Sequence, residues 1–196
     1  EGDNLLEVKE IQNKMKASAP LVENRKYYTM AMDENNEAVF TLVENPKEEE
    51  IDNYYIDTIV GIASSEGKMV NFAVEDVRPM GRTASGVIGI DLPEGAEAVG
   101  VTVAYEGDLV LVVTDKGYGK MTHFSEYRVT QRGAKGVSTL KSTDKIGRIV
   151  AIRTVNSDDD LMVITNYGIV IRTHLTEVRQ SSRNTQGVKI LNLEGR

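Results

Sequence analysis

The sequence predicts an all-β, propeller-like fold with about four blades, each of them a four-stranded sheet. Three observations support this prediction. A unit of about 50 residues recurs along the chain and begins at Asp57, Asp108 and Asp160. Each unit contains β-branched runs, and these runs are bounded by turns that contain glycine, as in short strands joined by hairpins. A sandwich or barrel is the alternative all-β fold, but neither requires a loop repeated at a fixed step.

Four strands are expected in each complete unit, in the same order. The first strand is "TIVGIA", "LVLVVT" or "LMVITN", and the second is "KMVNFA", "GKMTHF" or "IVIRTHL". A polar loop with arginine and glycine follows, and the third strand begins at Val87, Val137 or Val188. The fourth strand is "AVGVTVAY" in one unit and "RIVAIRTV" in the next.

The units are expected to form a single domain over residues 1–196. Its repeats are residues 57–107, 108–159 and 160–196, preceded by an eroded repeat over residues 24–56. Residues 1–23 are expected to form either a closing strand or a short helix. The stretch "EGDNLLEVKEI" resembles a fourth strand, and such a strand would complete the last blade and remove an exposed edge. The alternative is a short amphipathic helix over residues 4–16.

Two sets of glycines and one set of arginines keep the register of the repeat. The turn glycines are Gly67, Gly86, Gly117, Gly136, Gly168 and Gly187. Arg82, Arg132 and Arg183 each lie four residues before a glycine of the second set, and a valine follows each of those glycines. We expect glycine at these positions because the backbone turns sharply there, often with positive φ.

The charge of the chain is unevenly distributed. The net charge is −7, and residues 1–60 hold 14 acids and 6 bases, which gives −8. Residues 61–196 hold 16 acids and 17 bases, which gives +1, and many of these bases lie in loops such as "SEYRVTQRGAKG" and "TEVRQSSRNTQG". The acidity therefore belongs to the front of the chain, and the later loops are candidates for binding a polyanion.

The composition excludes several classes of protein and site. The chain has no cysteine, so disulfides, thiol catalysis and cysteine-ligated zinc are excluded. No apolar run approaches the roughly 18 residues of a membrane helix, and no basic flank leads into a hydrophobic stretch at the N-terminus. We therefore expect a cytoplasmic protein with no membrane partner.

Candidate catalytic and metal-binding residues do not form a recognisable site. Tyr28 has no base or metal evident beside it to activate it as a nucleophile. His123 and His174 occupy matching places on different repeats, which favours exposed strand residues over a shared metal site. The acids at 158–160 lack the alternation and central glycine of a calcium loop. The sequence thus predicts neither a catalytic site nor a metal or other cofactor.

Three segments carry a family resemblance: "VRPMGRTASGVIGI", "GYGKMTHFSEYRVTQRGAKGV" and "GIVIRTHLTEVRQSSRNTQGVKIL". They resemble the repeats in the C-terminal domain of the DNA gyrase A subunit. Slightly less closely, they resemble those in the matching domain of topoisomerase IV. The resemblance implies a β-pinwheel, a propeller-like ring whose neighbouring blades exchange strands and whose outer rim bends DNA. It also implies a non-catalytic module whose partners are double-stranded DNA, an ATPase partner subunit, and the remainder of the A subunit.

Basic residues of the repeats are the candidates for contacts with the DNA backbone, because such contacts are made by cations and carry no sequence information. The residues predicted to contact DNA are Arg78, Arg82, Lys120, Arg128, Arg132, Lys135, Arg172, Arg179, Arg183 and Lys189. For Arg82, Arg132 and Arg183 the alternative is a structural role, with hydrogen bonds to carbonyl groups or a stem packed between blades. The alternative for the whole chain is a protein-interaction propeller that does not bind DNA itself.

Overall fold

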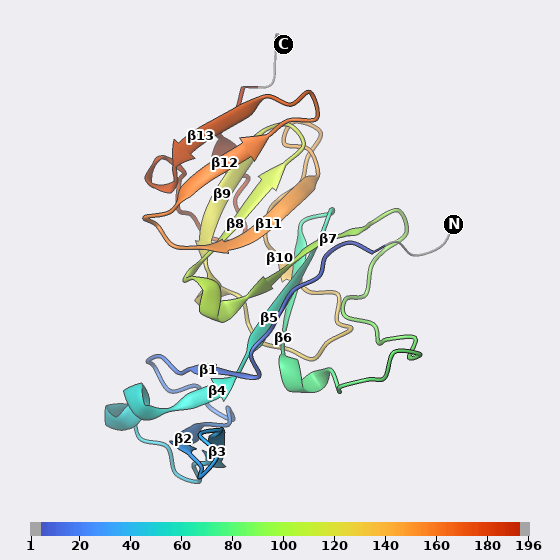
Figure 1. The fold of residues 1–196 in the computed structure, drawn as a ribbon. Helices are drawn as coiled ribbons and strands as arrows, with labels where there is room; N and C mark the ends of the chain where they lie inside the picture. The colour runs from blue at the N-terminus through green and yellow to red at the C-terminus, as the bar shows by residue number, and fades with distance from the viewer. Residues whose placement is uncertain (1–4, 193–196) are drawn as a thin grey trace.

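The computed structural model describes residues 5–192, which form a row of β-sheets connected by turns and short 3-10 helices (Figure 1). Three sheets have four strands and the last has two. The 3-10 helices are η1 (Glu48–Asn53), η2 (Val74–Asp76), η3 (Ala104–Glu106), η4 (Phe124–Glu126) and η5 (Leu175–Glu177). The all-β, propeller-like prediction is confirmed.

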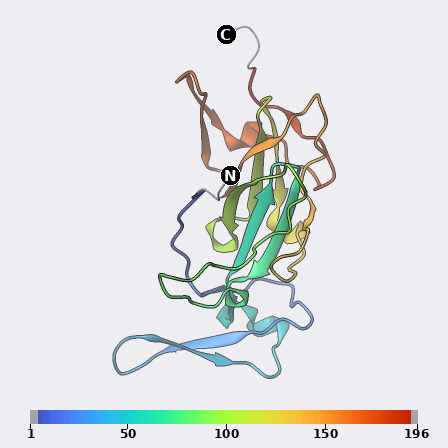
Figure 2. The same ribbon diagram turned by 90° about the vertical axis from the view of Figure 1, so that its right-hand side faces the viewer.

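The first sheet comes from the acidic front of the chain. Its strands lie in the order β1-β4-β2-β3, and their bounds are β1 (Lys14–Lys16), β2 (Tyr28–Met32), β3 (Ala38–Leu42) and β4 (Tyr55–Asp57). The hairpin of β2 and β3 projects away from the other sheets (Figure 2).

The second, third and fourth sheets follow the sequence repeats. The second sheet has the order β10-β6-β5-β7, with β5 (Ile59–Ser64), β6 (Lys68–Ala73), β7 (Ala98–Val103) and β10 (Val137–Ser138). The third has the order β11-β8-β9-β14, with β8 (Leu109–Thr114), β9 (Tyr118–His123), β11 (Ile149–Val155) and β14 (Val188–Lys189). The fourth consists of β12 (Asp160–Ile164) and β13 (Val170–His174).

Neighbouring sheets exchange one strand. The third strand of the 108–159 repeat, β10, pairs with β6 of the preceding repeat, where Val137 lies opposite Met69. The third strand of the last repeat, β14, pairs in the same way with β9, where Val188 lies opposite Gly119. Each complete blade therefore contains three strands of one repeat and one strand of the next, which is the arrangement that defines a β-pinwheel.

Two sequence expectations differ from the structure. The third strand expected at Val87 does not form within the described residues, where only Ile90 makes a bridge, to Ala134. By the exchange rule this strand would pair with the first sheet, whose described strands pair only with one another.

The N-terminal segment also lies elsewhere than expected. Residues 5–16 contain no helix, and β1 pairs with β4 of the first sheet rather than with the last blade. Ahead of β1, the side chain of Glu7 accepts a hydrogen bond from the backbone N–H of Val101 at the free edge of β7. The N-terminal segment thus covers an edge in the second blade, where its carboxylate satisfies a backbone donor that a strand would otherwise pair.

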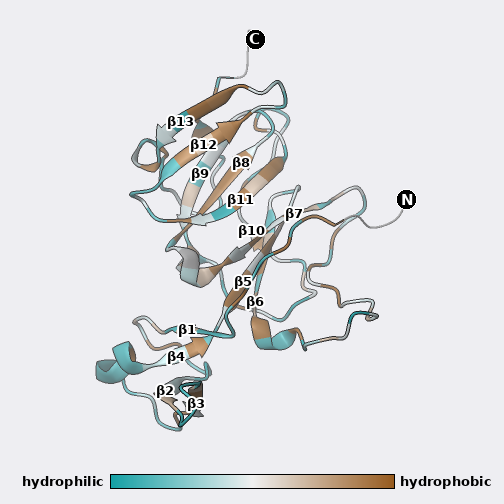
Figure 3. Cartoon of the chain, viewed as in Figure 1, coloured by the Kyte–Doolittle hydropathy of each residue, from teal (hydrophilic) through white to brown (hydrophobic). Residues whose placement is uncertain are grey.

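The core lies between the sheets, and every residue of β8 is buried in it. Figure 3 shows this strand coloured as hydrophobic. Alternate side chains of a strand point to opposite faces. Val110 and Val112 pack with Ala63 and Met69 of the second sheet, whereas Leu109, Leu111 and Val113 pack with Leu175 beside the fourth sheet. Burial on both faces explains why β8 is a continuous apolar run rather than an alternating one.

Candidate nucleic-acid interface

The loop before each exchanged strand lies along one edge of a sheet. In the second sheet, Asn71 of β6 forms a parallel bridge with Val129, and β10 then pairs with the beginning of β6. In the third sheet, Met121 of β9 forms the matching bridge with Gln180, and β14 follows. The chain thus leaves and rejoins the edge around a short loop, and the opposite edges, β7 and β11, face each other.

These loops are connected in series. The N–H of Gly133 donates to the carbonyl of Gly89 (2.7 Å), so the loop before β10 touches the segment just after Val87. Farther along, the N–H of Lys141, just beyond β10, donates to the carbonyl of Thr185 (3.4 Å) in the loop before β14. Successive loops are thus connected through residues in or next to them, and we call residues 78–89, 128–137 and 179–189 together the basic edge.

The basic edge is strongly positive although the chain as a whole is acidic. It contains eight bases and no acids, in a chain with 23 bases and 30 acids. Five of these bases are exposed and make no side-chain hydrogen bond or ion pair with other residues in the 5–192 range, and they are Arg78, Arg82, Arg128, Lys135 and Arg179. Their charges are therefore available to a polyanion. Lys189, on β14, is also exposed.

Arg132 and Arg183 are half-buried and bind carbonyl groups of the preceding repeat. Arg132 donates from Nε to the carbonyl of Asp76 and from Nη1 to that of Ile88, both at 3.0 Å. Arg183 donates from Nη1 to the carbonyl of Ser138 (3.0 Å). This is the structural alternative that the sequence left open. Arg82, the third member of the series, is exposed and makes no such bond within the described chain.

Lys120 corrects the sequence prediction. Its side chain is 0% exposed, and its ammonium donates to the carbonyls of Ser182 (2.6 Å) and Arg183 (2.7 Å) and to Thr185 Oγ1 (3.1 Å). Burial lowers the pKa of Lys120 to about 8. A cation enclosed by the loop before β14 is not available to a phosphate, so Lys120 supports that loop of the next repeat from inside rather than binding DNA.

Arg172 lies apart from the basic edge, on β13. Its guanidinium pairs with Asp160 of β12, and His174 Nδ1 is 2.5 Å from the other oxygen of the same carboxylate. Hydrogen bonds from Arg172 and then from His174 lower the pKa of Asp160. The partner carboxylate already offsets the charge of Arg172.

The predicted turn glycines all have positive φ, between 75° and 81°. At four of them, Gly67, Gly117, Gly136 and Gly187, a side chain is also excluded by a backbone carbonyl oxygen less than 3 Å away. A Cβ on Gly136 would lie 2.5 Å from the carbonyl oxygen of Met69, and one on Gly187 would lie 2.5 Å from that of Gly119. These glycines allow the exchanged strands β10 and β14 to approach the preceding repeat.

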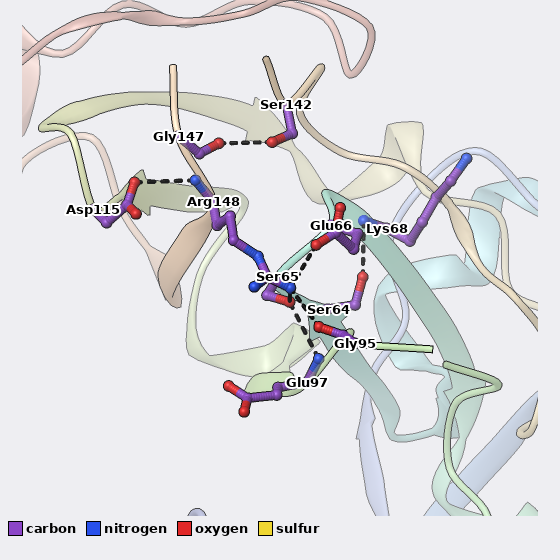
Figure 4. A network of polar contacts seen from close by, with 10 residues as sticks. All are labelled: Ser64, Ser65, Glu66, Lys68, Gly95, Glu97, Asp115, Ser142, Gly147 and Arg148. Atoms are coloured by element: carbon purple, nitrogen blue, oxygen red, sulfur yellow. Dashed lines mark hydrogen bonds and ion pairs between the residues drawn. The ribbon is translucent and has the colours of Figure 1, made fainter. Parts of the chain in front are cut away.

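Sequence reasoning missed Arg148, which joins the second and third sheets (Figure 4). Its guanidinium donates to Ser65 Oγ (3.1 Å) and the carbonyl of Gly95 (2.6 Å), and it lies 2.6 Å from Glu66 Oε1. All three acceptors lie at least 53 positions away, so no local pattern indicates them.

No group of three or more His, Cys, Asp or Glu is placed to hold a metal within residues 5–192. A cavity of about 720 Å³ between β11 and the fourth sheet is lined mainly by apolar residues such as Leu111, Val113 and Leu161. No helix of the described part is long and apolar enough to cross a membrane.

Comparison with known families connects this geometry to a function. A family model described as "DNA gyrase C-terminal domain, beta-propeller" matches residues 62–104, 108–156 and 159–196, well over half of the chain. The chain belongs to the DNA gyrase C-terminal domain family. The family prediction is thereby confirmed, and because the matched domain is a non-catalytic module, the catalytic domain is not part of this chain.

Relatives of known sequence support the same family assignment. The chain is 44% identical over 134 residues to the DNA gyrase A subunit of Staphylococcus aureus (strain MRSA252) and, equally, to that of strain NCTC 8325 / PS 47. Each match covers 67% of this chain and 15% of the relative's length. The chain therefore corresponds to a small part of these gyrase proteins.

Solved structures of the family share the fold. The C-terminal domain of DNA topoisomerase IV superposes with a TM-score of 0.65 and 19% identity, over 87% of this chain and 58% of that one. The E. coli ParC C-terminal domain gives a TM-score of 0.55 and 17% identity, over 86% of this chain and 73% of that one. At such identities the likeness shows the fold, and the pinwheel prediction is confirmed.

Proposed function

We propose that this chain is the DNA-bending module of a bacterial type II topoisomerase and that it binds duplex DNA along the basic edge. One observation carries the proposal: loops of successive repeats are connected in series and carry eight bases with no acid. Cations spaced along the basic edge suit the phosphates of a bent duplex, because backbone contacts position DNA without reading its sequence. The partners are then duplex DNA, the ATPase partner subunit, and the remainder of the A subunit, in the cytoplasm.

The salt dependence of binding tests this proposal. If the five exposed cations each neutralise one phosphate, the logarithm of the affinity falls with the logarithm of salt concentration at a slope of about −4.5. Fluorescence anisotropy with a labelled duplex of several tens of base pairs measures this slope, and unrelated sequences should give the same value. A slope near zero would contradict the proposal.

A matched pair of charge reversals locates the binding surface. Arg128→Glu removes an exposed cation of the basic edge, whereas Lys26→Glu makes the same change of charge just before β2, at an exposed position far along the chain from that edge. We expect Arg128→Glu to weaken binding and to reduce the steepness of the slope by about 0.9, because one phosphate contact is lost. Lys26→Glu should change the affinity much less. Equal losses would place the interface elsewhere.

The alternative is a protein-interaction module, and the projecting β2–β3 hairpin is the observation that favours it. Met32 and Leu42 of this hairpin are each half exposed, so the hairpin presents apolar surface away from the other sheets (Figure 2). Binding of a protein through apolar contacts would respond weakly to salt. Retention of DNA affinity after Met32→Lys, with loss of a protein partner, would assign the two activities to different parts of the chain.

A further inference from the structure

A small cavity of about 140 Å³ lies inside the loop of the basic edge that precedes β10. It is formed by β6, by the first residues of the loop and by the residues leading into β10. The loop is held against β6 by the N–H of Thr130, which donates to the carbonyl of Asn71 (2.7 Å). The cavity therefore belongs to the fixed part of the loop, where the backbone is bonded to the sheet.

One polar side chain in this cavity is buried without a partner. Asn71 is 1% exposed, and neither its Nδ2 nor its Oδ1 has a hydrogen-bond partner in the described part of the chain. Leaving a buried amide unpaired costs about 1–3 kcal/mol, so native proteins seldom do so without a ligand, ion or water to satisfy it. Asn71 lines the cavity, and the missing partner is therefore expected there.

The amide has one atom of each hydrogen-bonding kind. Asn71 Oδ1 lies against β5, 2.6 Å from the position that a Cβ on Gly61 would take. The amide nitrogen is the donor of this cavity-lining side chain, and it too is buried without a partner in the described part of the chain. It can therefore donate a hydrogen bond to whatever occupies the cavity.

The charge around the cavity selects an anion. Arg128 and Lys135 line it, both are exposed, and no carboxylate is among the lining residues. A volume of about 140 Å³ accommodates a five-atom tetrahedral oxyanion, since a single water takes about 30 Å³ of liquid volume. Two cations and one amide donor converging on such a space match the acceptor oxygens of a phosphate group.

We infer that this cavity binds one phosphate group, supplied by the DNA backbone, with Asn71 as its buried donor and Arg128 and Lys135 as its cations. This inference rests on the proposed function. It adds that the repeats do not grip DNA equally and that one contact is a discrete pocket.

The next repeat lacks this pocket and supplies an internal control. Met121 occupies the place of Asn71, as the matching bridges to Val129 and Gln180 show, and it is buried in an apolar cluster. The residues 51 positions after Arg128 and Lys135 are Arg179 and Gln186. The cation that corresponds to Lys135 is therefore also missing from that loop. The interior of that loop is filled instead by the ammonium of Lys120.

The test pairs Asn71→Leu with Met121→Leu in the whole chain, and its first measurement uses no DNA. Phosphate is compared with chloride at equal ionic strength by ³¹P NMR line broadening and by thermal unfolding. Wild type and Met121→Leu should bind phosphate, and Asn71→Leu should not. In chloride, Asn71→Leu should be at least as stable as wild type, because the unpaired amide is gone. A folded double variant, Arg128→Gln with Lys135→Gln, should also lose the phosphate signal.

The second measurement is DNA affinity at several salt concentrations. Asn71→Leu should weaken binding about tenfold, the effect of one charge-assisted hydrogen bond, without changing the salt slope, because no charge is removed. Met121→Leu should have no effect. If Asn71→Leu binds phosphate and DNA like wild type, the inference is overturned while the proposed function stands.

The remaining outcomes separate the two sources of phosphate. Loss of inorganic phosphate binding with unchanged DNA affinity would assign the pocket to free phosphate and overturn its assignment to the DNA backbone. Phosphate binding that depends on Asn71, in a wild-type chain that binds no DNA, would overturn the proposed function and with it the backbone as the source.

Discussion

The strand exchange makes a quantitative prediction for three equivalent glycines. Gly86, Gly136 and Gly187 occupy the same place in successive repeats and have φ of 78°, 76° and 75°. Alanine at any of them incurs the cost of a left-handed backbone, about 1 kcal/mol. A Cβ on Gly86 meets nothing within 4 Å, whereas a Cβ on Gly136 or Gly187 would lie 2.5 Å from a backbone carbonyl oxygen.

The difference between these variants isolates the close approach of the exchanged strand. Overpacking against a fixed group costs about 1–3 kcal/mol, and here the group is backbone that carries sheet hydrogen bonds. We therefore expect Gly86→Ala to lower the free energy of unfolding by about 1 kcal/mol, and Gly136→Ala and Gly187→Ala to lower it by about 2–4 kcal/mol each.

Urea unfolding followed by circular dichroism measures these changes, provided that each transition is two-state. A change of 1 kcal/mol corresponds to about 2–4 °C in Tm for a domain of this size, so thermal scans give an independent reading. Equal destabilisation by all three variants would refute the reasoning, because it would mean that φ alone determines the need for glycine.

Three further predictions concern charge and exposed surface. From pH 7.5 to 9.5, the free energy of unfolding of the wild type in urea should rise by about 2 kcal/mol relative to that of Lys120→Met, because with a pKa of about 8 the folded chain binds fewer protons than the unfolded one. A difference in unfolding free energy that does not change with pH would contradict this. Because the pKa of Asp160 is lowered in the folded chain, its contribution to stability is present above the unfolded pKa and is lost as pH falls through the folded pKa. Asp160→Asn should therefore flatten the fall of Tm at acid pH, and an unchanged fall would exclude stabilisation by the pair with Arg172. Met162 and Ile164 are 61% and 65% exposed on β12, which has a free edge in the described structure. Ile164→Lys should therefore reduce aggregation measured by light scattering with little change in Tm, and unchanged scattering would show that this edge is not the aggregation site.

The internal arginine series shows how far the candidate site could be predicted. Arg82, Arg132 and Arg183 are indistinguishable in register, and sequence reasoning left phosphate binding and a structural role equally open for all three. The structure separates them, because Arg132 and Arg183 bind carbonyls of the preceding repeat whereas Arg82 is exposed. The outcome depends on whether the preceding repeat supplies acceptors, which is a property of another part of the chain.

Lys120 and Asn71 are two further residues whose roles could not be predicted from the sequence: one predicted to bind DNA is buried, and one with no predicted role lines a cavity. Lys120 is among the residues that the sequence predicts to contact DNA, but its ammonium is enclosed by acceptors 62 to 65 positions away. Asn71 lies in the equivalent strand of the preceding repeat and reads as an ordinary polar strand residue. Its unpaired amide is visible only once the loop before β10 is placed over it.

The sequence by itself determined the repeat, most strands of the complete units, the turn glycines and the basic composition of the loops. These features are local, because period-two alternation and positive φ are set by residues within a few positions of one another. Only the tertiary structure decided which sheet each third strand joins and which cations remain free. A two-residue strand has too few contacts to select its own sheet, and the acceptors that bind or release a side chain come from a neighbouring repeat about fifty residues away.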